Sequence, residues 1–192
     1  MKNLKFLFLT LLSSAVIVSC SDDDDDTPEP INEEEVITTL ILEFDAEGSA
    51  QDFEVRVTDA DGEGPLDPVV SGNLALVAGE TYEVEVTVLN ELDPTDIEDI
   101  TEEVDEEDDE HQFFYTFTSG TGVVVDYDDQ DDDGNPVGIE TIFVVDDNAT
   151  DGTLVVTLLH EPNKDADGVS DGDPTNANGE TDIQATFNYT VQ

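Results

Sequence analysis

Apolar and polar side chains alternate with a period of two along most of this chain, most clearly at residues 82–88 and 183–191. Successive side chains of a strand point to opposite faces, so this alternation is typical of strands that are buried on one face only. The same pattern recurs less regularly in other segments, and about nine strands are expected in all. The weaker segments are residues 36–44, 53–57, 73–77, 112–118, 122–127, 139–145 and 153–160.

Clusters of Gly, Asp, Asn and Pro separate these segments, for example at residues 59–65 and 135–136. Such residues supply the backbone angles and local hydrogen bonds that tight turns require. Many short strands with regular turn signals predict an all-β fold, and we expect an immunoglobulin-like antiparallel β-sandwich of about seven to nine strands. A jelly roll or another Greek-key arrangement remains open, because strand count and alternation do not separate these folds.

One helix interrupts the strands. Pro94 and the pattern Thr95-x-x-Glu98 form a capping-box signature for a helix start, and Ile100 and Val104 follow at helical spacing. The acidic residues 105–110 would lie at the negative end of the helix dipole, where carboxylates are unfavourable. We therefore expect a short helix that ends between residues 104 and 106.

The N-terminus carries an export signal. Lys2 and Lys5 precede an apolar stretch at residues 6–18, which is too short to span a bilayer but has the size of a secretory signal. The only cysteine, Cys20, follows at once and is itself followed by a Ser-Asp run at residues 21–26. We predict a signal peptide at residues 1–19, a lipidated Cys20 with an acidic tether at 20–35, and a single β-sandwich domain at 36–192.

This leader resembles the lipobox of bacterial lipoproteins, and the Ser-Asp run resembles the signal that exports lipoproteins of the Bacteroidota to the cell surface. The resemblance implies anchoring to the outer membrane through lipid on Cys20, with the protein exposed outside the cell. The acidic, Asp-Gly-rich remainder is similar to small flavobacterial lipoproteins, some of which carry the label "type 1 periplasmic binding fold". That two-lobed fold needs alternating strands and helices over a longer chain, so the pattern here favours the sandwich.

The charge balance excludes some partners. The chain has 51 acidic residues against four Lys and Arg, and a formal net charge of −47. Since Lys2 and Lys5 leave with the predicted signal, only Arg56 and Lys164 remain as bases. Nucleic acid and anionic lipid surfaces both need a cationic binding face, so we expect neither as a partner. Cations are the natural counterparts, and folding should strengthen with salt or divalent ions.

Residues 129–140 match the twelve-residue calcium-loop pattern D-x-[DN]-x-[DN]-G-x5-E at every defined position. Calcium takes six to eight oxygen ligands, which carboxylates at alternate positions, one backbone carbonyl and a closing Glu can supply. The flanking segments are predicted strands rather than the helices of an EF-hand, so the ion would lie in a strand connection. The predicted ligands are Asp129, Asp131, Asp133, Asn135 and Glu140.

A second run has the same first half and resembles a calcium-binding unit of type 3 thrombospondin repeats, but Pro174 replaces the closing Glu. Its predicted ligands are Asn163, Asp165, Asp167 and Asp171. For both runs, the alternative is a solvated turn whose carboxylates face water. Bound calcium would remove local repulsion and stabilise the fold, so Ca²⁺ is the predicted cofactor.

Other chemistry has little support. With Cys20 acylated no thiol remains, and His111 and His160 are too few nitrogen donors for zinc, so each is expected to be a surface residue at a strand end. No nucleophile elbow, Walker loop or Rossmann fingerprint occurs. We expect no catalytic residues and a non-catalytic binding or structural module at the cell surface. The alternatives are an accessory ligand-binding lipoprotein that works with an outer-membrane uptake protein and, last, an acid-based hydrolase.

Overall fold

The computed structural model describes residues 35–62, 65–118 and 120–192. The chain divides into two units, residues 1–33 and 34–192, and the described residues belong to the second. The predicted signal peptide at 1–19, the lipidation site Cys20 and all of the tether except Glu35 therefore lie outside the described residues.

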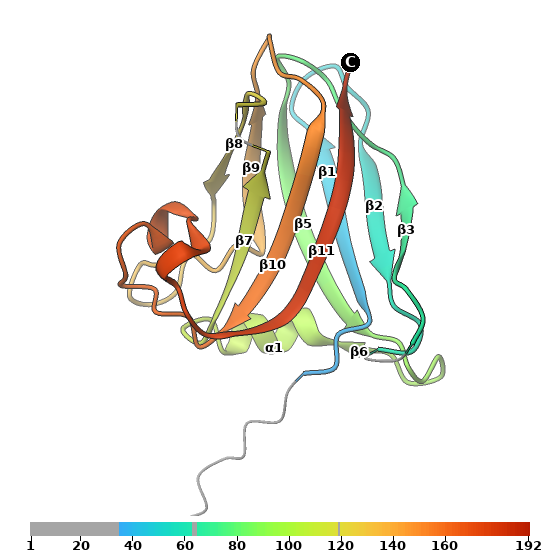
Figure 1. Cartoon of the computed structure of the whole chain (residues 1–192), viewed down its shortest axis with the longest axis vertical. Helices are drawn as coiled ribbons and strands as arrows, with labels where there is room; N and C mark the ends of the chain where they lie inside the picture. The colour runs from blue at the N-terminus through green and yellow to red at the C-terminus, as the bar shows by residue number, and fades with distance from the viewer. Residues whose placement is uncertain (1–34, 63–64, 119) are drawn as a thin grey trace, which may run out of the picture. The chain divides into compact units, whose positions relative to one another are not determined.

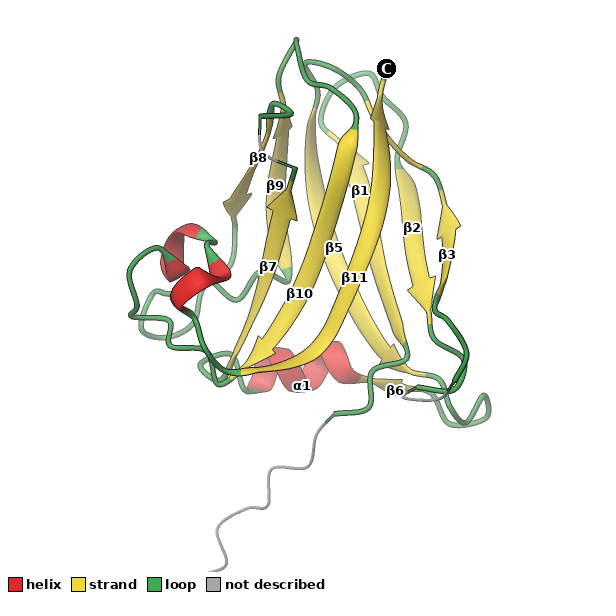
Figure 2. Cartoon of the chain, viewed as in Figure 1, coloured by secondary structure: helices red, strands yellow, loops and turns green. Residues whose placement is uncertain are grey.

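The described residues form eleven strands, one α-helix and two 3₁₀ helices (Figures 1 and 2). In chain order, these elements are β1 (Thr39–Ala46), β2 (Phe53–Thr58), β3 (Val69–Gly72), β4 (Leu74–Leu76), β5 (Thr81–Asn90), β6 (Glu98–Asp99), α1 (Ile100–Glu106), β7 (His111–Phe117), β8 (Val123–Tyr127), β9 (Glu140–Val145), β10 (Gly152–His160), η1 (Val169–Asp171), η2 (Pro174–Asn176) and β11 (Glu180–Val191).

The strands form two sheets, and the fold is the all-β sandwich that the alternation predicts. A seven-stranded sheet has the order β3-β2-β1-β5-β9-β8, with β6 paired to β5, and a four-stranded sheet has the order β4-β11-β10-β7. Neighbouring strands run antiparallel except for β4, which lies parallel to β11. Figure 1 shows the two sheets facing each other, with α1 across their lower end.

The core lies between the sheets, where each strand places its apolar positions. Tyr82 and Val84 of β5 are buried, whereas Glu83 between them is exposed, as alternation requires. Phe143 of the seven-stranded sheet meets Tyr115 of the other sheet edge to face, with ring centroids 5.5 Å apart. Aromatic pairs of this geometry add packing energy beyond their buried area, so they help to hold the layers together.

All nine predicted strands are confirmed, with bounds shifted by a few residues, but two short strands were missed. One is β3, whose four residues are all exposed, and the other is the two-residue β6. Neither places alternate side chains in the core, so neither has the pattern from which a strand is predicted. Each forms because its backbone pairs with an existing strand, β3 with β2 and β6 with β5.

The predicted helix is confirmed, but its predicted start is wrong. The helix begins at Ile100, and Asp99 is the N-cap, with its side chain accepting a hydrogen bond from the Thr101 amide. Asp93 instead caps a separate turn by accepting from the Thr95 amide, so Thr95 does not start the helix. The helix ends at Glu106, within the predicted range of residues 104–106. Within the described residues, no helix combines the length and apolarity that crossing a membrane requires.

A second, smaller apolar cluster lies on the outer side of the four-stranded sheet. Phe114 of β7 and Leu159 of β10 pack there against Val169 and Ala177, which belong to the segment that contains η1 and η2. This segment includes the second predicted calcium run. It is therefore held on the sheet by its own apolar residues, while its carboxylates stay exposed.

Candidate functional site

The first predicted calcium loop is a well-connected turn between β8 and β9, built around Asp129. The carboxylate of Asp129 accepts hydrogen bonds from the backbone amides of Gly138 (2.7 Å), Ile139 (2.6 Å) and Glu140 (3.0 Å). Three amides on one carboxylate hold the two ends of the loop together at the start of β9. Asp129 therefore has a structural role here, whether or not an ion is bound.

Asp131 is the buried carboxylate of this loop, with 5% of the residue exposed. Its Oδ1 accepts from the amides of Asp133 (3.0 Å) and Asn135 (2.8 Å), and Gly134 makes the turn between them with a φ of 87°. Burial acts to raise the pKa of Asp131, but the Asn135 amide and the ammonium group of Lys164 outweigh it and lower the pKa. The carboxylate is thus ionised inside the loop.

The cation that meets Asp131 comes from the second run. Lys164 is 6% exposed, and its Nζ lies 3.1 Å from Asp131 Oδ2. The same ammonium group donates to the carbonyl oxygens of Asp108 (2.5 Å) and Pro136 (3.3 Å). Three oxygens thus surround one protein cation. Lys164 occupies an undefined position of the calcium motif, but it is one of only four Lys and Arg residues in a very acidic chain, and that rarity was a usable signal.

The structure brings the two predicted runs side by side, which the sequence did not predict. Asp131, Asp133 and Asn135 of the first run line a cleft of about 550 Å³ together with Asn163 and Asp165 of the second. We call this the paired-loop cleft.

The other predicted ligands lie outside the paired-loop cleft. Asp129 and Asp171 line a neighbouring cleft, and Glu140 lies apart on the sheet face. Asp167 is exposed, and its backbone carbonyl accepts from the Asn176 side chain. Among the described residues, three groups of His, Asp or Glu have ligand atoms within 4.8 Å of one another, and none contains a predicted calcium ligand. Calcium in these loops stays a prediction.

The outer face of the seven-stranded sheet carries a row of glutamates in register. Glu43 lies directly opposite Glu54 on one side and Glu85 on the other, and Glu85 lies opposite Glu140. This glutamate row of Glu54, Glu43, Glu85 and Glu140 therefore crosses β2, β1, β5 and β9. Directly opposed side chains are about 5 Å apart, and like charges at that distance are destabilising.

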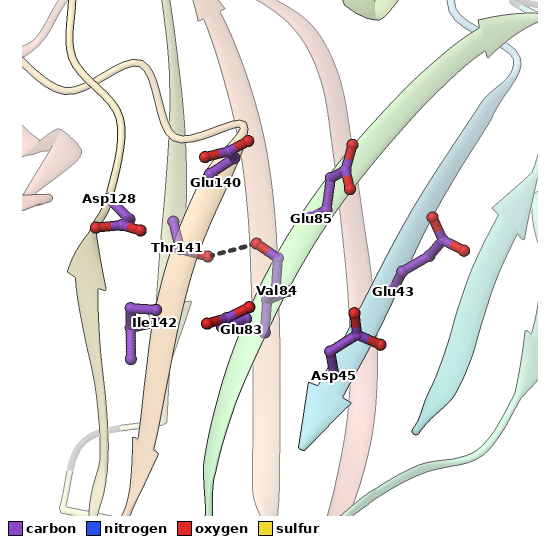
Figure 3. A pocket seen from close by; sticks show the side chains of 9 residues that line it. All are labelled: Glu43, Asp45, Glu83, Val84, Glu85, Asp128, Glu140, Thr141 and Ile142. Atoms are coloured by element: carbon purple, nitrogen blue, oxygen red, sulfur yellow. Dashed lines mark hydrogen bonds between the residues drawn. The ribbon is translucent and has the colours of Figure 1, made fainter. Parts of the chain in front are cut away.

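Further carboxylates flank the glutamate row. Figure 3 shows Glu43, Glu85 and Glu140 with Asp45 and Glu83 around a cleft of about 240 Å³ on this face. Asp45 and Glu83 are themselves a directly opposed pair one pleat further along β1 and β5. The face is thus a continuous acidic surface rather than a single pair of acids.

The described residues include one Arg and one Lys, and each forms an ion pair with a carboxylate outside the glutamate row. Arg56 lies 2.8 Å from Glu91, and Lys164 is held by Asp131. Neither ion pair involves the glutamate row. The mutual repulsion of the glutamate row is therefore left to screening by ions of the solvent.

The prediction for the two histidines is wrong. His111 and His160 do lie at strand ends, but they are 0% and 4% exposed rather than on the surface. The register of β7 and β10 places them directly opposite each other, with ring centroids 4.6 Å apart. Because their pairing depends on the register of two strands whose histidines lie 49 positions apart in the chain, the sequence pattern alone could not bring them together.

In comparisons with protein-family models, curated proteins and solved structures, nothing matches this chain.

Proposed function

We propose that this protein is a non-catalytic binding or structural module of the outer-membrane surface, anchored through lipid on Cys20 and stabilised by cations on its acidic surfaces. The leader at residues 17–26 supports the anchor and the address. β1 begins at Thr39, 19 residues after Cys20, and a fully extended segment of that length would place the domain at most about 65 Å from its anchor.

The glutamate row is the observation that supports stabilisation by cations. Four carboxylates stand in register across four strands, and the described Lys and Arg side chains are used elsewhere. Opposed like charges cost each pair up to about 1 kcal/mol, and solvent cations reduce that cost by screening or by binding. The fold should therefore gain stability as the cation concentration around it rises.

Calcium is the cation we propose for the paired-loop cleft. Asp133, Asn135 and Asp165 all line this cleft and offer the oxygen ligands that calcium prefers. Asp129 and Asp131 already accept backbone amides, and Asp131 is also paired with Lys164, so these two carboxylates would shape the loop rather than bind the ion. In this proposal the ion stabilises the fold and takes no part in turnover.

Labelling with a radioactive fatty acid tests the anchor. The full-length chain is expressed in a bacterium that exports lipoproteins, and incorporation of label is compared between the natural chain, Cys20→Ser and the matched neighbour Ser21→Ala. We expect label on the natural chain and on Ser21→Ala, and none on Cys20→Ser. Equal labelling of all three, or none in any, would contradict the proposed anchor.

Protease treatment of intact cells tests the surface address. Digestion of the domain on whole cells, with a periplasmic marker left intact, is the expected result. Protection of the domain until the outer membrane is opened would place it on the inner side and contradict the proposal.

A further inference from the structure

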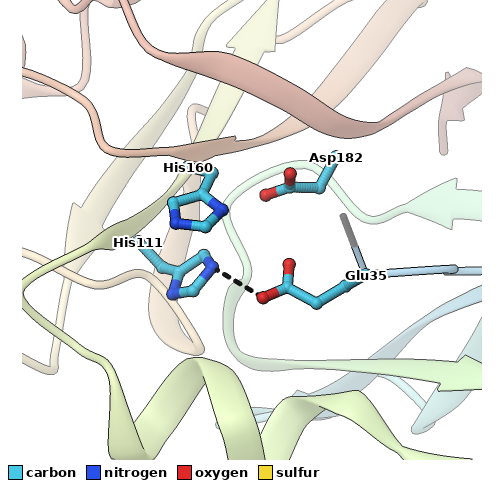
Figure 4. Close-up of side chains that lie close together, drawn as sticks. All are labelled: Glu35, His111, His160 and Asp182. Carbon is cyan, nitrogen blue, oxygen red and sulfur yellow. Dashed lines mark ion pairs between the residues drawn. The ribbon is translucent and has the colours of Figure 1, made fainter. Parts of the chain in front are cut away.

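Four titratable side chains converge at the end of the sandwich that α1 covers. His111 is the first residue of β7 and His160 the last of β10, while Asp182 lies on β11 and Glu35 precedes β1. One potential ligand atom of each lies within 4.8 Å of one of every other. Figure 4 shows the two imidazole rings and the two carboxylates pointing toward a common centre. We call these four residues the His-carboxylate cluster.

A β-bulge aims Asp182 into this cluster. Leu158 pairs with Ile183, but Leu159 pairs with Thr181, so Asp182 is an extra residue on β11. A bulge of this kind turns a side chain out of the regular alternation and is over-represented beside functional sites. Without it, the alternation that buries Ala185 and Phe187 would point Asp182 away from the sandwich interior.

The hydrogen bond of His111 fixes which of its nitrogens can act as a ligand. Nδ1 lies 3.1 Å from the carbonyl oxygen of Glu107, which can only accept, so Nδ1 carries a proton. The other nitrogen, Nε2, is turned toward Glu35 Oε1 at 3.4 Å. A backbone carbonyl on one ring nitrogen, with the other nitrogen facing a carboxylate-lined centre, is the arrangement found in metal-binding histidines.

Three atoms of the cluster are buried without a hydrogen-bond partner in the described structure. They are His111 Nε2, Glu35 Oε2 and Asp182 Oδ2. Buried polar atoms are nearly always paired, and an unpaired one calls for an ion, a water molecule or strain. The His111 side chain is 0% and the Glu35 side chain 5% exposed, so bulk water does not reach them to supply the missing hydrogen bonds.

The groups of the cluster also shift one another's pKa. Burial and the nearby charge of Glu35 raise the pKa of Asp182 to about 6. The nearby imidazole of His111 lowers the pKa of Glu35 despite its burial. Burial acts to lower the pKa of His111, but Glu35 and the Glu107 carbonyl outweigh it and raise the pKa. A divalent cation bound by the two ionised carboxylates, with each imidazole donating a lone pair, would leave the cluster without net charge.

We propose that Glu35, His111, His160 and Asp182 bind one divalent transition-metal ion of the zinc class as a structural site. Bonds of about 2.0–2.2 Å in a tetrahedron place neighbouring ligand atoms about 3.3–3.6 Å apart, and the His111 to Glu35 separation already has this length. Two imidazole nitrogens favour zinc, copper or nickel over calcium or magnesium. Four protein ligands leave no open position, as in structural sites.

Such an ion would join the two layers of the sandwich. Glu35 leads into β1 of the seven-stranded sheet, whereas His111, His160 and Asp182 belong to the four-stranded sheet. The site is separate from the glutamate row and the paired-loop cleft, and it does not depend on the proposed function. It would tie the start of the domain to the opposite sheet.

Zinc binding to the chelator-treated full-length chain tests this inference by calorimetry. Millimolar calcium in the buffer occupies the exposed carboxylates, so that only a selective zinc site is counted. The variants are His111→Gln and Asp182→Asn, with Glu102→Gln on the exposed side of α1 as the matched control. Circular dichroism and urea unfolding establish that each variant is folded.

We expect one zinc ion per chain, affinity reduced by about 100-fold or more in both cluster variants, and unchanged affinity in Glu102→Gln. X-ray absorption of the zinc-loaded natural chain gives a readout that needs no variant, and it should show two imidazoles among the ligands. Absence of selective zinc binding, a zinc site without imidazole, or natural affinity in folded cluster variants would each overturn the proposal.

Discussion

Replacing Lys164 by Met is the most informative single change in the paired-loop cleft. Methionine keeps the length of the apolar stem but removes the ammonium group, which has three oxygen partners. Asp131, with 5% of the residue exposed, would then hold a buried negative charge without its cation.

The expected loss is large. Removing one partner of a buried ion pair costs about 3–5 kcal/mol, because the remaining charge is desolvated and uncompensated. The amides of Asp133 and Asn135 still donate to Asp131, so we expect about 3 kcal/mol, the lower end. Domains are stable by about 5–15 kcal/mol in total, so Lys164→Met should remove a substantial fraction of the stability.

Urea unfolding followed by tyrosine fluorescence and circular dichroism measures this loss, since the chain has no Trp. Asp131→Asn and the double variant complete a mutant cycle, in which the second change should cost much less than in the natural chain.

The stability that ionised Asp131 contributes depends on pH with a definite sign. Because the pKa of Asp131 is lower in the folded state, its contribution is present above about pH 4 and is lost as the pH falls through the folded pKa. A loss below about 1 kcal/mol for Lys164→Met at neutral pH, or additive effects in the cycle, would refute this reasoning.

The remaining predictions concern other parts of the sandwich. Glu85→Lys should raise the free energy of unfolding by about 0.5–1 kcal/mol at low salt and by less at high salt, because it removes two opposed like-charge pairs. The control is Glu47→Lys, which makes the same charge change outside the glutamate row, in the loop after β1. Asp182→Asn should stabilise the metal-free chain at pH 7. The pKa of Asp182 is raised to about 6 in the folded state, so the natural carboxylate increasingly destabilises the fold as the pH rises from about 4 through about 6. Urea unfolding should therefore show no advantage of the variant below about pH 4. Tyr127→Phe removes the hydrogen bond from its hydroxyl to the Phe113 carbonyl at 2.8 Å and should cost about 1 kcal/mol in the same assay, with a loss near zero contradicting the role of that bond.

The strands were predictable because burial of one face requires apolar residues at every second position of a strand. Tyr82 and Val84 face the core with Glu83 outside, and the same physics places every predicted strand in one of the two sheets. The strand order was not predictable, since alternation records which face is buried but not which strand lies alongside. The parallel pairing of β4 with β11 has no signature in either segment.

The local motifs gave part of the candidate site. The turn at Gly134 and the approach of Asp131 to the Asn135 amide follow from the spacing of the motif. The contact between Lys164 and Asp131 does not, because it joins residues 33 positions apart through the packing of one loop on another.

The His-carboxylate cluster was out of reach for a related reason. It depends on the register that opposes His111 and His160 and on the bulge that turns Asp182 inward. Both are properties of strand pairing, which a single sequence does not display.

We propose that the acidic surfaces of this sandwich depend on cations from the solvent for their stability. The most direct test of this claim is the free energy of unfolding of the full-length chain in chelator, in sodium chloride, and in calcium chloride at matched ionic strength. We predict that stability rises with sodium chloride through screening and rises further with calcium. Identical stability under all three conditions would contradict the claim.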